Sequence, residues 1–163
     1  QGASYFTTVV WGLAGDTPVT GDYEGDGKAD FVVQRAEGGA SVFHRYFATG
    51  QYDTRTLGNA NDLTAVADYD GDGKTDLVTL ALSGGSWVWS IRNSSNGVVN
   101  TVTWGQANDV PVPGDYDGDG KADVAVWRAG SPSTFYVQGS GGTSFTQNWG
   151  AADDYPVAAF NVR

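Results

Sequence analysis

One short acidic segment occurs three times in the chain, and its residue types suit the binding of a hard metal ion. The copies span residues 22–30, 68–76 and 115–123, and the third reads Asp-Tyr-Asp-Gly-Asp-Gly-Lys-Ala-Asp. In each copy carboxylates stand at positions 1, 3, 5 and 9, separated by residues that let the backbone curl around one centre. Calcium takes about 6 to 8 oxygen ligands, which four carboxylates, the backbone carbonyl of position 7 and water can supply. The spacing therefore predicts three calcium sites.

The repeated segment has two alternative interpretations. An EF-hand loop needs a bidentate Glu at position 12, but the chain has Val33, Thr79 and Val126 there, each inside an apolar run. The second alternative is a set of polar turns whose aspartates only cap strands, as Asx turns do. Three copies at one fixed register favour metal binding over this alternative.

Length and composition indicate one all-β domain. The chain has 163 residues with 24 Gly, no Cys and no Met, and no window shows convincing helical periodicity. The three acidic segments hold 12 of the 19 acidic residues, so most of the formal charge of −10 belongs to the predicted metal sites. We therefore expect neither a nucleic-acid-binding surface nor insertion into a membrane.

The predicted calcium loops favour a setting outside the cell. The absence of cysteine means that there is no disulfide framework, and it does not locate the protein. Weak calcium loops of this kind fill at the millimolar free calcium found outside cells. The sequence begins at Gln1 and shows no signal peptide, as expected for a mature or excised segment. We predict a secreted, extracellular protein.

A second motif divides the chain into repeats. A Trp or Leu is followed by Gly, and an Asp stands four residues after that glycine; the motif begins at Trp11, Leu57, Trp104 and Trp149. Spacings of 45 to 47 residues match one four-stranded blade of a β-propeller. The predicted repeats span approximately 12–58, 59–105 and 106–150, with terminal strands in 1–11 and 151–163.

Within the first repeat we predict strands at 18–23, 31–35, 41–47 and 52–57, with the acidic loop between the first two. The last copy of the motif has Phe160 where the first ligand would stand, so no fourth site is expected. Three whole blades cannot close a ring of the usual four to eight, and an open propeller would leave apolar faces in water. We therefore expect a second chain to close the ring, either in a homodimer or as a second fragment.

These repeats resemble the FG-GAP and VCBS repeats of bacterial secreted proteins, of the integrin α-subunit head and of an integrin-like fungal lectin. The resemblance covers residues 10–162 and implies a β-propeller, usually seven-bladed, with calcium in the loop between the first two strands of a blade. By position it implies the side-chain ligands Asp22, Glu24, Asp26, Asp30, Asp68, Asp70, Asp72, Asp76, Asp115, Asp117, Asp119 and Asp123. It adds the backbone carbonyls of Lys28, Lys74 and Lys121. Glu24 departs from the usual Asp or Asn.

The remaining residues do not suggest catalysis. His44 is the only histidine, and the chain has neither a Gly-x-Ser-x-Gly elbow nor a phosphate-cradling glycine loop. Among the acids outside the loops, Asp16, Asp62, Asp109 and Asp154 recur at one repeat position. That recurrence favours a role in turns over a catalytic acid pair. We predict that the protein is not an enzyme.

Ligand recognition is the favoured class of function. Arg35 and Arg128 stand at matching repeat positions and could hold a carboxylate or a sugar hydroxyl. Trp87, Trp89 and Trp127 could offer flat faces to a sugar ring, although the alternation of Trp87 and Trp89 also fits packing. We predict a glycan-binding module. The alternative is a protein-interaction or adhesion module, or an accessory domain of a larger secreted enzyme.

Overall fold

The chain folds as a series of antiparallel β-sheets. The structure, a computed structural model, describes residues 8–157, and in that range three four-stranded sheets form without any helix. The first sheet contains β1 (Thr17–Pro18), β2 (Phe31–Glu37), β3 (Ala40–Tyr46) and β4 (Tyr52–Asn59). The second contains β5 (Leu63–Thr64), β6 (Leu77–Ser83), β7 (Ser86–Arg92) and β8 (Val99–Gln106). The third contains β9 (Val110–Pro111), β10 (Val124–Arg128), β11 (Thr134–Gln138) and β12 (Ser144–Asn148).

Each sheet is a propeller-type blade, as the sequence period predicts. Strands pair antiparallel with their sequence neighbours, in the order β1-β2-β3-β4 in the first blade and likewise in the others. The hairpins after β2 and β6 turn through Gly38–Gly39 and Gly84–Gly85, where all four φ values are positive. Two successive left-handed residues make the turn whose twist matches that of the flanking strands.

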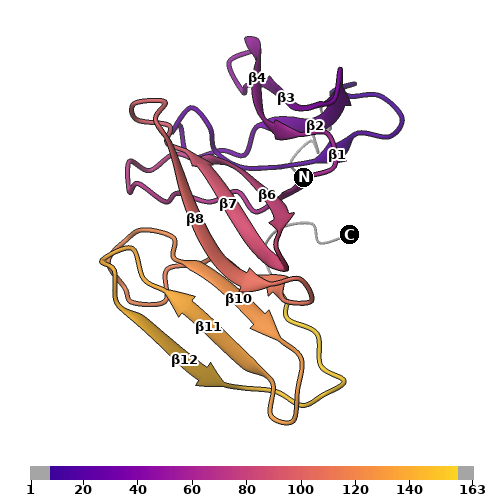
Figure 1. Ribbon diagram of the computed structural model, residues 1–163. Helices are drawn as coiled ribbons and strands as arrows, with labels where there is room; N and C mark the ends of the chain where they lie inside the picture. Colours follow the sequence, from indigo (N-terminus) through magenta and orange to yellow (C-terminus); the bar gives the residue numbers. More distant parts are fainter. Residues whose placement is uncertain (1–7, 158–163) are drawn as a thin grey trace, which may run out of the picture.

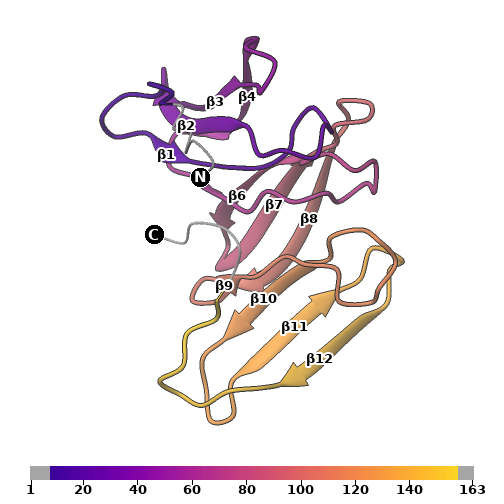
Figure 2. The ribbon, with the colours of Figure 1, turned by 180° about the vertical axis from the view of Figure 1, so that it is seen from behind.

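The blades pack face to face, with the second between the first and the third (Figures 1 and 2). Successive side chains of β6 point to opposite neighbours, as the pleat requires. Leu77 packs with Val32 and Phe43 of the first blade. Val78 packs in a second cluster with Trp89 and with Val126 of the third blade. The apolar core therefore lies in the gaps between blades.

The first strand of each blade is shorter than predicted. We expected a strand at 18–23, but β1 has two residues and is followed only by an isolated bridge between Gly21 and Asp30. The backbone N–H of Tyr23 bonds the Asp30 carboxylate at 2.8 Å, so it is unavailable to a neighbouring strand. The acidic loop thus begins inside the predicted strand and shortens it.

Two tryptophans of the second motif bond the third strand of the blade that follows them, whereas the copy between the first and second blades has Leu57 instead. The Trp11 indole donates to the carbonyl of His44 at 3.2 Å, and the Trp104 indole donates to that of Tyr136 at 3.0 Å. Trp149, after β12, is 74% exposed and has no such bond within residues 8–157. Of the predicted terminal strands, the described parts, 8–11 and 151–157, contain no strand, and the rest, including Phe160, lies outside the described residues.

Candidate metal centres

The three acidic loops lie along one edge of the molecule, between the first and second strands of their blades (left in Figure 1). Glycines stand at positions 4 and 6 of every loop, and all have φ between 79° and 86°. A side chain with a Cβ is strained at such φ values. These glycines therefore allow the curl that turns the carboxylates toward one another.

The aspartate at position 1 organises the loop backbone. In the second loop, Asp68 accepts the backbone N–H of Gly71 at 2.6 Å through Oδ1 and that of Gly73 at 2.8 Å through Oδ2. Asp22 and Asp115 accept the equivalent bonds in their own loops. The turn-forming role considered as an alternative is therefore part of the structure, and it fixes where the carboxylate lies.

The aspartate at position 9 links the loop to the turn between the third and fourth strands. Asp76, which is fully buried, accepts the N–H of Tyr69 at 2.8 Å and that of Ser94 at 2.7 Å. Asp30 and Asp123 make the same pair of bonds, the second to Ala48 and Ser140. Sequence reasoning predicted this turn but missed its bond to the aspartate, although the offset of 17 to 18 residues between the two could have revealed it.

Two loops bring three carboxylates together. Oxygens of Asp68, Asp70 and Asp76, and likewise of Asp115, Asp117 and Asp123, all lie within 4.8 Å of one another. Two ligands about 2.4 Å from one calcium ion can be at most about 5 Å apart. Positions 1, 3 and 9 of these loops therefore fit a single ion.

The aspartate at position 5, predicted as a fourth ligand, lies outside both triplets. Asp72 accepts the hydroxyl of Ser94 at 2.8 Å, and Asp119 accepts that of Ser140. This carboxylate thus bonds the same turn as the position 9 aspartate. Its role as a ligand stays a prediction, as do the roles of the position 7 carbonyls.

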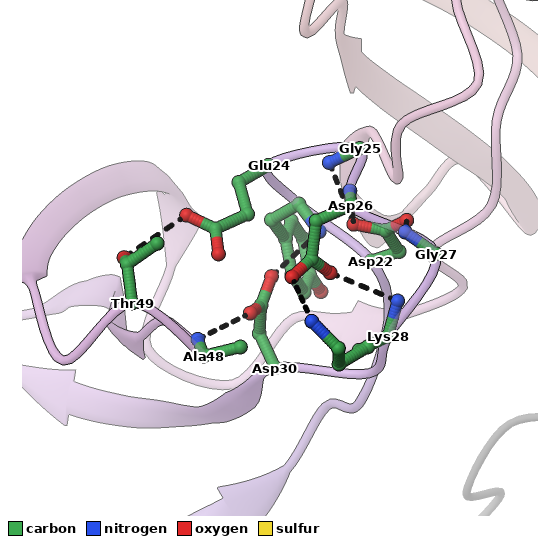
Figure 3. Close-up of polar contacts among 10 residues, drawn as sticks. Asp22, Glu24, Gly25, Asp26, Gly27, Lys28, Asp30, Ala48 and Thr49 are labelled. Carbon is green, nitrogen blue, oxygen red and sulfur yellow. Dashed lines mark hydrogen bonds and ion pairs between the residues drawn. The ribbon is translucent and has the colours of Figure 1, made fainter.

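The first loop is arranged differently (Figure 3). Asp22, Glu24 and Asp30 form no comparable triplet among the described residues. The longer Glu24 side chain reaches the hydroxyl of Thr49, which donates to Oε2 at 3.2 Å. Its other oxygen, Oε1, is buried and has no hydrogen bond within residues 8–157. A buried, unpartnered carboxylate oxygen is costly, and a cation in the loop would satisfy it.

Electrostatics in the triplets also fit a cation. Burial raises the pKa of Asp76, and the neighbouring Asp70 carboxylate adds to the rise. Desolvation likewise raises the pKa of Asp117, together with the charges of Asp123 and Asp119. A bound divalent ion would reverse this repulsion and favour the ionised acids. The donor set, all hard oxygens, suits calcium.

Neighbouring loops are hydrogen-bonded to each other. The N–H of Thr75, at position 8 of the second loop, donates to the carbonyl of Asp22, at position 1 of the first loop, at 2.7 Å. Ala122 makes the same bond to Asp68, also at 2.7 Å. The three loops therefore form one bonded row, in which each ligand-bearing aspartate holds the next loop.

Lysine side chains cover the same row. Lys74 lies over Gly25 of the preceding loop, with Cε 3.0 Å from the place where a Cβ would stand, and Lys121 lies over Gly71 in the same way. Gly118 of the last loop has no atom of the described residues at the equivalent place. Each loop thus presents a glycine surface that the next repeat covers, and the row ends at Gly118 within residues 8–157.

Aspartates of the second motif close turns at the opposite ends of the blades. Each carboxylate accepts a backbone N–H three residues earlier in the chain, at 2.7 to 2.8 Å. The four donors are Leu13, Asn59, Gln106 and Ala151, and the four acceptors are Asp16, Asp62, Asp109 and Asp154. The bonds support the turn role inferred from their recurrence.

Arg35 and Arg128, predicted to contact a ligand, pair with these aspartates. Arg35 donates to Asp16 through Nε at 2.7 Å and Nη2 at 2.8 Å, and this pairing holds the pKa of the Asp16 carboxyl below its usual value. Arg128 donates to Asp109 through the same atoms at 2.7 and 2.8 Å. Both guanidinium groups therefore have a structural role, and their contact with an external ligand stays a prediction.

Of the three tryptophans predicted to contact a sugar, Trp87 and Trp89 lie between the second and third blades, and Trp127 packs on the other face of the third blade. Trp89 is fully buried and donates to the carbonyl of Trp104, and Trp127 is only 4% exposed. Trp87 is half-buried and donates to the carbonyl of Asp109 at 3.2 Å. Their burial favours the packing alternative over contact with a ligand.

Comparison with known proteins identifies the repeats. The sequence model of the FG-GAP-like repeat matches residues 22–79 and 68–126, which include all three acidic loops. No curated protein and no solved structure matches the chain. The two matched segments together span more than half of the chain, from the first acidic loop into β10. The chain therefore belongs to the FG-GAP-like repeat family.

Proposed function

We propose that the protein is a calcium-stabilised recognition module. FG-GAP repeats form β-propeller-like domains for recognition or adhesion, and such domains are generally non-catalytic. The two carboxylate triplets carry the calcium part of the proposal, and the unpartnered Glu24 oxygen supports a third ion. No helix among residues 8–157 is long and apolar enough to span a bilayer. An extracellular setting, where calcium is abundant, is part of the proposal.

Calorimetric titration of the chelated protein with calcium tests this. Three ions should bind, and the second and third loops should bind more tightly than the first, whose acids are arranged differently. Asp68→Asn and Asp115→Asn should each remove one binding event. Absence of binding at millimolar calcium would overturn the proposal.

For the ligand, we propose a glycan in the crevice between the second and third blades. A cavity of about 360 Å³ there is lined by Trp104, Tyr136, Thr103, Gln106 and Arg128. Aromatic faces next to amide, hydroxyl and guanidinium groups suit a sugar, which offers apolar C–H faces and hydroxyls together. The protein is proposed to bind this ligand without transforming it.

A glycan array followed by titration with the best glycan tests the ligand class. Gln106→Ala combined with Thr103→Val should weaken binding about 10-fold or more, because a hydrogen bond to a ligand is worth about 1 kcal/mol. Gln51→Ala, an exposed glutamine in the turn before β4, is the matched control. Binding to an extracellular protein, with no glycan bound, would favour the adhesion alternative.

We also propose that a second copy of the chain covers the outer face of the third blade. Within residues 8–157 that face offers the bare Gly118, the carbonyl of Asp115 and the exposed Trp149. In the two gaps between blades, a lysine of the following loop covers the equivalent glycine, and a backbone N–H of that loop donates to the equivalent aspartate carbonyl. Lys28 and Ala29 of the first loop present the same groups, and a copy placed head to tail would continue the row.

Light scattering in calcium measures the mass, which should be twice the 17.1 kDa of one chain. Trp149→Asp should reduce it to one chain. Val98→Asp, at a 53% exposed position in a turn of the second blade, should leave it unchanged. A wild-type monomer at about 100 µM would refute self-association at a Kd in the micromolar range or below.

A further inference from the structure

The three blades differ at one polar position near the second motif. In the first and third blades, an arginine lies nineteen residues after the turn aspartate and donates two hydrogen bonds to it, of 2.7 and 2.8 Å. In the second blade the aspartate is Asp62 and the residue nineteen positions later is Ala81. A methyl group cannot donate a hydrogen bond, so the second blade has no counterpart of Arg35 or Arg128 at this position.

Only one of the two oxygens of the Asp62 carboxylate accepts a hydrogen bond within residues 8–157. Its Oδ2 accepts the N–H of Asn59 at 2.7 Å, as in the other turns, while Oδ1 has no hydrogen bond within the described part of the chain. Both carboxylate oxygens of Asp16 and of Asp109 accept hydrogen bonds from an arginine. Asp62 can therefore accept the same pair of bonds from a guanidinium group. An acid in a partly buried position gains from a cationic donor.

Asp62 lines a cavity of about 220 Å³ between the first and second blades. Thr17 and Gln34 of the first blade form another part of its wall, and no Lys, Arg or His is among the lining residues. Thr17 is 7% exposed, and its buried hydroxyl has no hydrogen-bond partner within residues 8–157. A buried hydroxyl without a partner is uncommon and calls for an explanation. The Thr17 hydroxyl is closed off from solvent, so the cavity offers the Asp62 carboxylate, with no positively charged side chain among its lining residues.

We propose that this cavity binds a guanidinium group from outside the chain, held by the Asp62 carboxylate. The planar fork of a guanidinium matches a carboxylate bidentately, and the blades on either side use the same match internally. The inference does not depend on the glycan crevice or the calcium loops, since neither contributes a residue to this cavity. The guanidinium can come from an arginine side chain of a peptide or from a free guanidino compound.

Binding to the calcium-loaded protein tests the proposal. Probes are an N-acetyl-arginine amide, its neutral citrulline counterpart and a short arginine-containing peptide, followed by chemical-shift titration. The arginine amide should bind at least about 10-fold more tightly than the citrulline amide, because the charge-assisted pair is lost in the latter. A peptide that binds more tightly still points to a protein source, and equal affinity for amide and peptide points to a free compound.

Two variants locate the site. Ala81→Arg should place an internal guanidinium on Asp62, abolish binding of the arginine amide and raise the melting temperature without any ligand. Asp62→Asn should weaken binding about 10-fold or more by removing the charge. Leu82→Arg adds the same charge at the next residue of β6, at a 53% exposed position facing the other side, and should leave binding unchanged.

Three outcomes would overturn the proposal. These are equal affinity for the arginine and citrulline amides, binding that survives both Ala81→Arg and Asp62→Asn, and no binding of any probe to the wild-type protein at about 100 mM, a concentration at which even weak sites fill. The melting temperature of Ala81→Arg shows that the variant is folded, so loss of binding cannot be attributed to unfolding.

Discussion

Carboxylates at different positions of one loop have separable roles. Asp70, at position 3, bonds the side chain of Ser95 at 2.6 Å near the surface, whereas Asp76, at position 9, holds two backbone N–H groups in the interior. We expect Asp70→Asn to weaken calcium binding by the second loop while leaving the calcium-free fold as stable as before. Asp76→Ala should destabilise the calcium-free fold by about 1–3 kcal/mol, because the Tyr69 and Ser94 N–H groups lose the fully buried carboxylate that accepts them.

Urea unfolding in chelator, combined with calcium titration, separates the two effects. If both variants destabilise the calcium-free protein equally, the division of roles is wrong. Asp53→Asn, an acid on β4 outside the loops, serves as a control for calcium affinity and should not change it.

Asp16 predicts a pH dependence of stability. Its side chain is 5% exposed and bonded to Arg35, which lowers the carboxyl pKa from its ordinary value of 3.8. An acid with a lowered pKa in the folded state stabilises the fold above its unfolded pKa, and this contribution is lost as pH falls through the folded value. The stability difference between wild type and Asp16→Asn should therefore be constant near neutral pH and shrink below about pH 4.

Chemical unfolding in chelator between pH 7 and pH 3 measures that difference. The matched control is Asp62→Asn, which removes the same turn acid from a blade that has no arginine partner. Parallel pH profiles for the two variants would contradict the role of Arg35.

Individual residues also show the limit of prediction from sequence. The loop acids were found because their spacing repeats, and the repeated turn acid marked Asp16 and its equivalents. The turn that contains Ser94 was predicted, but its bonds to the loop acids were not, because its N–H and hydroxyl are ordinary groups that the hairpin of β7 and β8 brings to the loop. Composition also does not say that Trp89 is fully buried, which favours packing over the ligand contact predicted for it.

At the scale of elements, the contact between successive loops is open to a paired test. Gly71 and Gly118 stand at the same loop position with φ of 79° and 80°, but only Gly71 is covered, by the Lys121 side chain. Alanine at either position meets the same backbone strain, worth about 1–3 kcal/mol. Gly71→Ala should cost more than Gly118→Ala, because it also displaces Lys121. Equal unfolding free energies for the two variants would show that the lysine contact contributes nothing.

The elements themselves followed largely from the sequence. Double glycines placed the hairpins after β2 and β6, and the 46-residue period placed the blades. The length of the first strand was overestimated, because its apolar residues are typical of a strand. The hydrogen bond from the Tyr23 N–H to Asp30 ends the pairing between strands early. That bond joins the two ends of the acidic loop, so it could not be predicted from residues 18–23 alone.

For the whole molecule, calcium should act as a stabilising ligand. Ions that bind only the folded chain add about 2.7 kcal/mol per site at 100 times the Kd. For a chain of this size, removal of one ion should lower the melting temperature by about 5 to 10 °C, and removal of all three ions by about 15 to 30 °C. Thermal unfolding in calcium and in EDTA measures the shift. Magnesium is the control, because it requires a stricter coordination geometry than calcium and should bind these loops poorly. An unchanged melting temperature would refute a stabilising role.

The bonded row of loops has a consequence for how the ions load. The carbonyl of Asp22 accepts a hydrogen bond from the second loop, and that of Asp68 accepts one from the third. An ion that orders one loop therefore also orders a group that its neighbour needs, so the second ion meets a lower entropic cost than the first. Occupancy should consequently rise with a Hill coefficient above one, and the row would respond to calcium as a threshold sensor rather than as three independent buffers.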